Sequence, residues 1–405
     1  MKEWKKVKLG EISTLSNGIN FDKSAYTSGI KLIGVSDFKD RLYPDYDSLQ
    51  EIDTKVIRSS DYLEKGDIVF VRSNGNKELV GRCMMIDREI PVTFSGFCIK
   101  LRLTDKNIFN PVFFNYLFRT RLFKKSITGT AVGANIQNLS QSRLGSCEIR
   151  VPNIEKQNAI ASILSRYDAL IENYQKQIKL LEEAAARLYK QWFVELKFPG
   201  YQNTNISDGV PEGWEKKKAQ DFFQMSIGKT PPRAEKQWFT DSINGIPWVS
   251  ISDMKDTTFI MDTSEGLTND ACEKFNVKVV EKGTILLSFK LTVGRVAITS
   301  KNVCTNEAIA HFRRNGNEWR EYTLLYLRHY NYDSLGNTSG ISKAVNSTII
   351  RNMPFLMPSK SILDKFHSKT NHIFDSILNL QSQIRHLTES RDRLLPKLMS
   401  GEIEV

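Results

Sequence analysis

The amino-acid sequence predicts an α+β fold: two globular α/β domains, related by a pseudo-twofold axis and separated by two long antiparallel coiled-coil helices. Three observations predict this fold. The chain of 405 residues contains an internal repeat, each copy of the repeat ends in a long heptad pattern, and strand-like runs precede each heptad pattern. A chain of this length also exceeds what one hydrophobic core normally organises, which favours two or three domains.

The internal repeat is clearest at the start of its second copy. At an offset of 210 residues, Trp4 pairs with Trp214 and Gly18 pairs with Gly228. Further matches, first copy before second, are "VSDFKD" (35–40) with "ISDMKD" (251–256) and "EKGDIVFV" (64–71) with "EKGTILLS" (281–288). After the last match, each copy reaches a Gly-Arg pair, and the intervening hairpin tips differ in length by four residues. Repetition on this scale predicts two domains of one fold.

The first part of each copy mixes short strand-like runs with turn residues, which is typical of a compact domain with much sheet. The runs are "GDIVFVRS" and "CIKLRL" in the first copy and "TILLSF" and "RVAITS" in the second. One short apolar helix is expected near 111–124 and another near 319–330.

The second part of each copy is predicted to be one long helix. From Ile160, apolar residues recur at alternating steps of four and three, and an offset of 206 residues repeats the pattern in the second copy. This spacing is typical of a coiled-coil seam. Pro152 and Pro358 mark the helix starts, whereas Thr370 and Arg391 break the second seam and are expected to face a partner. The predicted seam residues are Ile160, Leu164, Ile171, Ile178, Leu181, Leu188, Ile373, Ile377, Leu380, Ile384, Leu387 and Leu394.

Connectivity then suggests how the parts are arranged. If the two helices are antiparallel, the second helix ends beside the first domain, and the domains lie at opposite ends of the helix pair. The alternative is that each helix folds back separately onto its own domain. We expect the first domain at 1–150, a first helical spacer at 151–195, a linker at 196–212, the second domain at 213–356, a second helical spacer at 357–400 and a tail at 401–405.

Composition narrows the class of protein. Lysine and arginine number 57 against 46 aspartates and glutamates, a net charge of +11 that favours a polyanion such as nucleic acid. The five scattered cysteines favour reduced thiols in the cytoplasm. No apolar run approaches the roughly 20 residues that span a bilayer, and the N-terminus has no secretory signal. We therefore expect a cytoplasmic protein without a membrane partner.

The sequence predicts no catalytic residue, metal site or cofactor in this chain. All five histidines lie in the second half, which excludes a histidine mechanism shared by both copies. His367 and His372, five residues apart, are poorly spaced for one metal and are expected at the surface. The segment "RNMPF" (351–355) weakly resembles the Asn-Pro-Pro-aromatic loop of amino-methyltransferases. Since no cofactor-binding glycine motif accompanies it, we interpret this segment as a strand that enters the second helix.

Recognition of DNA remains as the function to consider. The hairpin tips "RSNGNKELVGR" (72–82) and "SFKLTVGR" (288–295) carry side chains that read guanine and adenine in the major groove. Flexible glycine-containing loops also suit contacts to phosphate, and 126–138, 336–346 and 228–239 are further candidates. The candidate DNA-binding residues are Arg72, Asn74, Asn76, Lys77, Arg82, Thr130, Asn135, Lys229, Arg233, Lys290, Thr292, Arg295 and Lys343.

The layout of domain, helix, domain, helix resembles the specificity subunit of type I restriction–modification enzymes. The resemblance rests on the paired Trp openings, the "EKGD" and "EKGT" segments, "VPNIEKQNAIASILSRYDALI" (151–171) and "LLPKLMSGEI" (394–403). These motifs span nearly the whole chain.

The resemblance implies two target recognition domains, each reading one part of a split double-stranded DNA target. The helices would measure the gap and dock two modification subunits, which carry S-adenosylmethionine and methylate adenine. Restriction subunits would add translocation and cleavage, so ATP and Mg are also expected on partners. Two alternatives stay open: a coiled-coil scaffold that binds polyanions without specificity, and a self-contained nuclease or methyltransferase.

Overall fold

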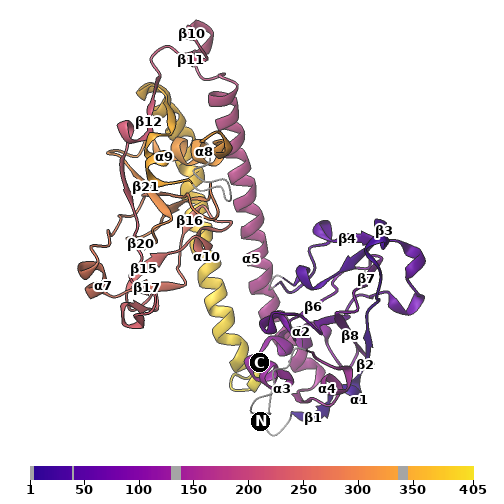
Figure 1. Cartoon of the computed structure of the whole chain (residues 1–405). Coiled ribbons are helices and arrows are strands. Elements are labelled where there is room, and N and C mark those ends of the chain that lie inside the picture. Colours follow the sequence, from indigo (N-terminus) through magenta and orange to yellow (C-terminus); the bar gives the residue numbers. More distant parts are fainter. Residues whose placement is uncertain (1–3, 39–40, 129–137, 336–344) are drawn as a thin grey trace. The chain divides into compact units, whose positions relative to one another are not determined.

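The chain divides into two compact units (Figure 1). Unit 1 comprises Met1–Ala169 and Thr388–Val405, and unit 2 comprises Leu170–Leu387. The computed structural model describes residues 4–38, 41–128, 138–335 and 345–405. Each unit contains one globular domain and a part of each long helix.

Domain 1, the globular part of unit 1, begins with β1 (Lys5–Lys8) and ends with β9 (Glu148–Val151), which pair antiparallel. A four-stranded sheet has the order β2-β8-β5-β6, and a three-stranded sheet has the order β4-β3-β7. The strands are β2 (Ser13–Asn17), β3 (Tyr26–Ile33), β4 (Gln50–Ile52), β5 (Ile68–Val71), β6 (Cys83–Met85), β7 (Val92–Phe94) and β8 (Cys98–Leu103). The helices are α1 (Leu9–Ile12), α2 (Pro111–Arg119), α3 (Arg121–Thr128) and α4 (Gln141–Gly145).

Domain 2, the globular part of unit 2, is closed in the same way by β12 (Glu215–Lys218) and β22 (Pro354–Met357). Its sheets have the orders β13-β21-β18-β19-β16 and β14-β17-β15-β20. The strands are β13 (Gln224–Ile227), β14 (Phe239–Thr240), β15 (Ile246–Val249), β16 (Phe259–Ile260), β17 (Glu265–Leu267), β18 (Ile285–Ser288), β19 (Val296–Thr299), β20 (Cys304–Thr305) and β21 (Ile309–Arg313). The helices are α6 (Ala219–Phe222), α7 (Asn269–Lys274), α8 (Arg320–His329) and α9 (Ser347–Asn352). A short hairpin, β10 (Ile206–Ser207) and β11 (Val210–Pro211), precedes the domain.

The same strand pairings recur in both domains, which confirms the predicted repeat. β5 pairs antiparallel with β6 and β8, as β18 pairs with β19 and β21. The four strand-like runs of the sequence coincide with β5, β8, β18 and β19. The apolar helix expected near 111–124 is divided at Thr120, where the hydroxyl group caps α2 by donating to the carbonyl of Leu117 (2.7 Å).

Gly18 and Gly228, paired by the repeat, occupy equivalent tight positions. The N–H group of Gly18 donates to the carbonyl of Cys98, and that of Gly228 to the carbonyl of Ile309, both at 3.2 Å. A Cβ atom on Gly18 would lie 2.3 Å from two backbone oxygens, and one on Gly228 would lie 2.1 Å from the Thr305 hydroxyl. The close approach of two backbone segments therefore explains why both copies carry glycine here.

His311 on β21 is buried and has both ring nitrogens bonded. Nδ1 lies 2.8 Å from Ser226 Oγ, and Nε2 lies 2.7 Å from Thr305 Oγ1. At the equivalent place in domain 1, Lys100 lies opposite Ser16, and its ammonium group donates to the carbonyl of Ser60 (2.9 Å). His311 thus has a structural role in domain 2, for which the first copy uses a different polar residue.

The stability of domain 2 is expected to depend on the protonation of His311. Burial, assisted by Lys278 and Arg313, lowers the pKa of His311 from 6.5 to about 4. Between these values the unfolded chain binds the proton and the folded domain does not, so the free energy of unfolding rises with pH across this window. The difference is on the order of 3 kcal/mol. Denaturant unfolding at several pH values between 4 and 7 measures this change in the free energy of unfolding. The variant His311→Gln should lose this part of the pH dependence. An unchanged pH slope in the variant would contradict the role given to His311.

Two long helices connect the domains. α5 runs from Ile154 to Tyr189 and continues as a π-helical turn over Lys190–Val194, and α10 runs from Lys360 to Ser400. Pro152 and Pro358 each lie two residues before the first helical residue. The expected prolines therefore precede the helices rather than form their first turns, since Asn153 caps α5 by accepting from the N–H group of Lys156 (3.1 Å).

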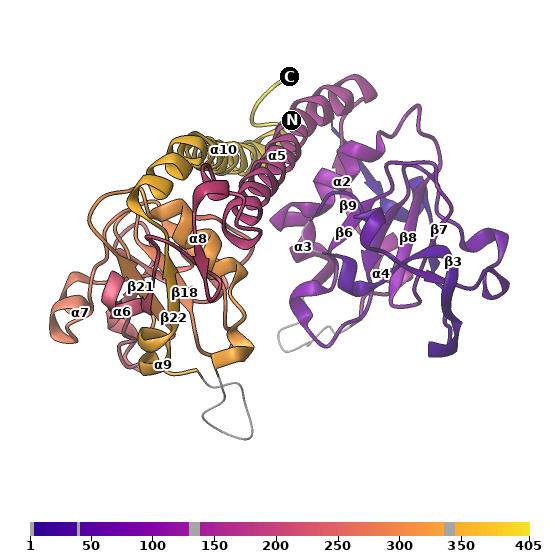
Figure 2. The ribbon, with the colours of Figure 1, turned by 90° about the horizontal axis from the view of Figure 1, so that it is seen from above.

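The helices are antiparallel in both units, as predicted. In unit 1, Leu398 and Met399 near the end of α10 belong to the hydrophobic core of domain 1. In unit 2, the Phe366 ring near the start of α10 packs on Trp192 and Phe193 near the end of α5, with centroid distances of 5.7 and 4.9 Å. Within unit 2, α10 lies beside α5 in both views (Figure 1 and Figure 2). The second helix therefore ends against the first domain, as the connectivity suggested.

The predicted seam residues differ in burial. Ile160, Leu164, Ile171 and Ile377 are buried, and the other eight are half-buried. The expectation that Thr370 and Arg391 face a partner is wrong. Thr370 is fully buried, and its hydroxyl group donates to the carbonyl of Phe366 (2.9 Å) within the same helix. This bond satisfies the buried hydroxyl group. The guanidinium group of Arg391 is half-buried in unit 1 and pairs with Asp168 of α5.

Candidate nucleic-acid interface

The two predicted hairpins close with the same backbone geometry although their tips differ in length. In domain 1, the N–H group of Gly81 donates to the carbonyl of Val71; in domain 2, that of Gly294 donates to the carbonyl of Ser288, both at 2.9 Å. The φ angles of the two glycines are +80° and +92°, in the left-handed region that favours glycine. The frame of the hairpin is therefore common to both domains, and the tip is the variable part.

The arginine that follows each of these glycines bonds within its own domain. Nη1 of Arg82 donates to the carbonyl of Phe38 (3.5 Å), and Nη1 of Arg295 donates to the carbonyl of Ile251 (2.7 Å). Both carbonyls belong to the repeated segments "VSDFKD" and "ISDMKD". Both arginines are half-buried. This geometry favours a structural role for the repeated Gly-Arg pair, in addition to the predicted contact with DNA.

The tip of the domain 1 hairpin is organised by its own asparagines. Asn74 Oδ1 accepts from the N–H group of Asn76 (2.7 Å), and Asn76 Oδ1 accepts from the N–H group of Glu78 (3.0 Å). A short 3₁₀ helix, Lys77–Leu79, follows. A bidentate asparagine contact to adenine uses the side-chain oxygen as well as the amide nitrogen. In this structure, the side-chain oxygens of both asparagines accept hydrogen bonds that stabilise the turn.

The tip of the domain 2 hairpin is shorter and closed by Ser288. Its hydroxyl group donates to the carbonyl of Thr292 (2.6 Å) and accepts from the N–H group of Arg295 (3.0 Å). Lys290 and Thr292, both predicted to bind DNA, are exposed. The structure therefore leaves these two polar side chains on a fixed, outward-facing turn.

In domain 1, two of the candidate segments meet. The carbonyl of Phe97 accepts from the N–H groups of Arg72 (2.8 Å) and Ser73 (3.3 Å). Ser73 also forms a β-bridge with Asn138, and the N–H group of Leu139 donates to the carbonyl of Arg72 (2.8 Å). The hairpin start thus lies beside the chain that follows the loop 126–138. Three candidates lie outside the described residues, namely Thr130, Asn135 and Lys343.

The remaining candidates, Lys229 and Arg233, differ in their surroundings. Lys229 is exposed. The guanidinium group of Arg233 pairs with Glu265 (2.7 Å) and lies 4.5 Å from the ring centroids of Phe239 and Trp248. Because these contacts occupy both its charge and its flat face, Arg233 holds the start of domain 2 against β14 and β15.

One polar cluster that joins a domain to both long helices was not expected from the sequence. In unit 1, Asp168 of α5 accepts from the hydroxyl of Tyr116 on α2 and pairs with Arg391 of α10. Burial, reinforced by the neighbouring carboxylate, raises the pKa of Tyr116, so its hydroxyl stays protonated and donates. The break in the heptad pattern at Arg391 was the one sequence signal of this cluster.

A second unexpected cluster lies in unit 2. The carboxylate of Glu321 is fully buried, accepts from Arg320 (2.8 Å) and lies 2.6 Å from Nδ1 of His367. The expectation that His367 lies at the surface is therefore wrong: the ring is half-buried because it partners a buried carboxylate. His372, by contrast, is exposed.

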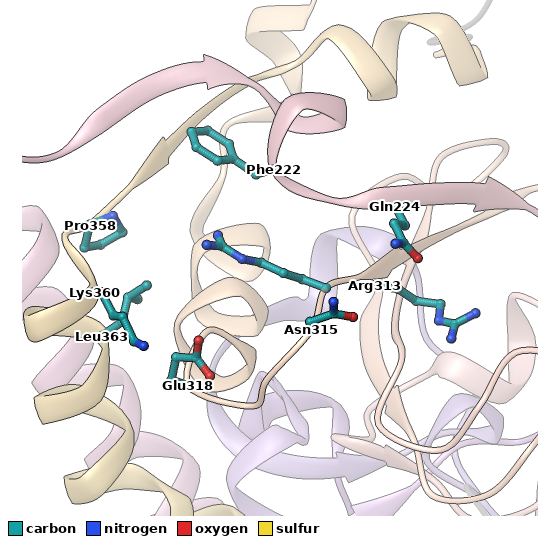
Figure 3. Close-up of a pocket in the computed structure, with 9 residues that line it drawn as sticks. Phe222, Gln224, Arg313, Asn315, Glu318, Pro358, Lys360 and Leu363 are labelled. Atoms are coloured by element: carbon teal, nitrogen blue, oxygen red, sulfur yellow. The ribbon is translucent and has the colours of Figure 1, made fainter.

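Unit 2 also contains a pocket with a volume of about 460 Å³ (Figure 3). Three cationic side chains line it, together with the carboxylate of Glu318. Arg313, one of the cations, is paired with Glu281 (2.8 Å). The other lining residues are Phe222, Gln224, Arg314, Asn315, Pro358, Lys360 and Leu363. None of the candidate DNA-binding residues that the structure describes lines this pocket.

Within the described ranges, no three histidine, cysteine, aspartate or glutamate side chains are grouped as metal ligands would be. The five cysteines are buried thiols, with the sulfur atoms of Cys272 and Cys304 3.5 Å apart. None of the helices that the structure describes combines the length and the hydrophobicity needed to cross a membrane.

Comparison with known proteins places these features in a family. The family model described as the type I restriction modification DNA specificity domain matches residues 1–183 and again 211–388. The MjaIX specificity subunit of a type I restriction enzyme from Methanocaldococcus jannaschii is 31% identical over 302 residues, which cover 72% of this chain and 68% of that relative. The HindI specificity subunit from Haemophilus influenzae is 25% identical, and the match covers 100% of both chains.

A solved structure shares the fold. The crystal structure of the type I restriction–modification S subunit from M. genitalium matches with a TM-score of 0.60 and 17% identity, covering 98% of this chain and 96% of that one. The family model matches both copies of the repeat and far more than half of the residues. The chain therefore belongs to the family of type I restriction–modification DNA specificity subunits, with two target recognition domains.

Proposed function

We propose that domain 1 and domain 2 each read one half of a bipartite double-stranded DNA target, while α5 and α10 set the spacing and dock two modification subunits. As a specificity subunit, the chain recognises DNA rather than catalysing a reaction. We assign the recognition domains to 1–150 and 213–356, the spacers to 151–195 and 357–400, and the linker to 196–212. Restriction subunits, with ATP and Mg, and S-adenosylmethionine on the modification subunits complete the proposed complex.

One observation carries this proposal: both domains present a hairpin with the same frame and a different tip. Gly81 and Gly294 close the two hairpins through equivalent hydrogen bonds. Between these fixed points, the tip of domain 1 carries Asn74 and Asn76, and the shorter tip of domain 2 carries Lys290 and Thr292. Base edges are read by side chains, whereas the scaffold only positions them. A shared scaffold with divergent tips is what two readers of different sequences need.

The charge and the helix length support the same function. The net charge of +11 favours contact with the phosphate backbone. α5 has 36 residues and is about 54 Å long at 1.5 Å per residue. This length exceeds one DNA turn of roughly 34 Å, as a target read in two separated parts requires.

Exchange of residues 74–79 for an unrelated loop of equal length tests this proposal, because it leaves Gly81 and Arg82 of the hairpin frame in place. We expect the recognised sequence to change in one half and to stay the same in the other, because the exchanged tip belongs to one reader. Sequencing of methylated adenines in cells that express the complete complex measures this. A matched control replaces Asp208 and Gly209, the turn of the β10–β11 hairpin, and should leave both halves unchanged.

Two outcomes would contradict the assignment of this tip. A change in both halves would mean that the tip affects the whole complex, and no change in either half would mean that it does not read bases. Equal binding of all duplexes by the unmodified complex would instead support a scaffold that binds polyanions without specificity.

A further inference from the structure

The tip of the domain 2 hairpin presents one aliphatic side chain almost entirely to solvent. Leu291 is 97% exposed, the largest value among the large hydrophobic side chains that the structure describes. It lies between Lys290 and Thr292, the two exposed residues already proposed to contact DNA. A single exposed leucine is common on protein surfaces and means little alone. Its backbone conformation distinguishes this one.

Leu291 adopts a conformation that leucine normally avoids. Its φ angle is +60°, in the left-handed region where the Cβ atom of an L-residue crowds the following carbonyl group. Three residues later, Gly294 also has a positive φ, which glycine adopts without steric cost. The longer tip of domain 1 has "SNGN" at 73–76, all residues that favour turns. Leu196 also has a positive φ (+55°), but it is half-buried and packs on the core of unit 2. Among the exposed large hydrophobic residues that the structure describes, only Leu291 has a positive φ.

The turn around Leu291 is fixed rather than loose. The N–H group of Thr292 donates to the carbonyl of Lys290 (2.6 Å), and the hydroxyl of Ser288 donates to the carbonyl of Thr292 (2.6 Å). At the base of the turn, the buried Phe289 donates its N–H group to the carbonyl of Ala308 (2.9 Å). These bonds hold the strained residue in place and direct its side chain outward. Strained residues held in this way are concentrated at ligand-binding sites.

We propose that Leu291 contacts the C5-methyl group of a thymine in the half of the target that domain 2 reads. This inference rests on the proposed function, because it requires the hairpin tip to enter the DNA groove. The thymine methyl group is an apolar feature of the major groove, and apolar side chains are its usual partners. Lys290 and Thr292 supply the polar contacts on either side. Leu291, between them, favours thymine over bases that lack the methyl group.

Leu291→Asn separates the apolar contact from the backbone conformation. Asparagine tolerates the left-handed region, so the fold should be kept or slightly stabilised. The affinity of the complete methylation complex for its duplex should fall roughly fourfold, the size expected for the loss of one buried methyl contact. Ile243→Asn is the matched control, because Ile243 is 90% exposed on another turn of the same domain. This control should leave the affinity unchanged.

Duplexes with uracil in place of thymine identify the ligand. In the wild-type complex, one substitution within the domain 2 half-target should weaken binding as much as Leu291→Asn does. In Leu291→Asn the same substitution should have no further effect, because the two partners of one contact are coupled. Full affinity of Leu291→Asn, or a uracil series without effect in the wild type, overturns the inference.

The outcome can be separated from that of the proposed function. If Lys290→Ala and Thr292→Ala change recognition of one half-target while Leu291→Asn binds like the wild type, the hairpin reads DNA and this inference alone is wrong. If none of the three variants affects binding, the hairpin does not read DNA, and the proposed function of this tip fails as well.

Discussion

Gly228→Ala is expected to destabilise domain 2 by about 3 kcal/mol, the upper range for overpacking a tight site. The added Cβ atom would lie 2.1 Å from the hydroxyl oxygen of Thr305 and 2.2 Å from the carbonyl oxygen of Asn306. Backbone atoms cannot turn aside as the end of a flexible side chain can, so the chain at the end of β13 must move away from Thr305 and Asn306, which disturbs its pairing with β21. Gly18→Ala should do the same in domain 1, where the nearest atoms are also backbone oxygens.

Hydrogen exchange can measure the two domains separately. In Gly228→Ala the amides of β21 should exchange faster while those of β8 keep their protection, and in Gly18→Ala the reverse should hold. Gly75→Ala is the matched control, because a Cβ atom at this position meets nothing within 4 Å. Wild-type protection of β21 in Gly228→Ala would contradict the packing described here. So would an equal loss of protection in Gly75→Ala.

Phe366→Ala is expected to cost about 3–5 kcal/mol, as is typical for removing a buried aromatic ring. The side chain is fully buried and packs on Trp192 and Phe193. Its loss leaves a cavity where the start of α10 meets the end of α5 within unit 2. Denaturant unfolding followed by tryptophan fluorescence should detect the change, since Trp192 forms one wall of the cavity.

His372→Ala on the same helix is the control for Phe366→Ala. His372 is exposed, so its substitution should change the free energy of unfolding by less than about 0.5 kcal/mol. Similar stabilities for the two variants would mean that the helices do not pack through Phe366. A loss in Phe366→Ala without a change near Trp192 would place the cavity elsewhere.

The candidate site was only partly predictable from the sequence. The hairpins were recognised because strand runs and a Gly-Arg pair recur at nearly constant spacing. The roles of Arg82 and Arg295 were not, since the carbonyl that each one reaches lies 44 positions earlier in the chain. The conformation of Leu291 was also not predictable from the sequence, because no local pattern predicts leucine with a positive φ angle.

The amino-acid sequence was sufficient to establish the repeat, the hairpins, the long helices and the family. These features depend on periodicity and on matches between segments, which can be read along the chain. The burial of Thr370, the pairing of Arg391 with Asp168 and the partner of His367 became clear only from the folded chain. Polar side chains take their roles from whichever groups the fold brings to them, and the sequence pattern does not record which groups those are.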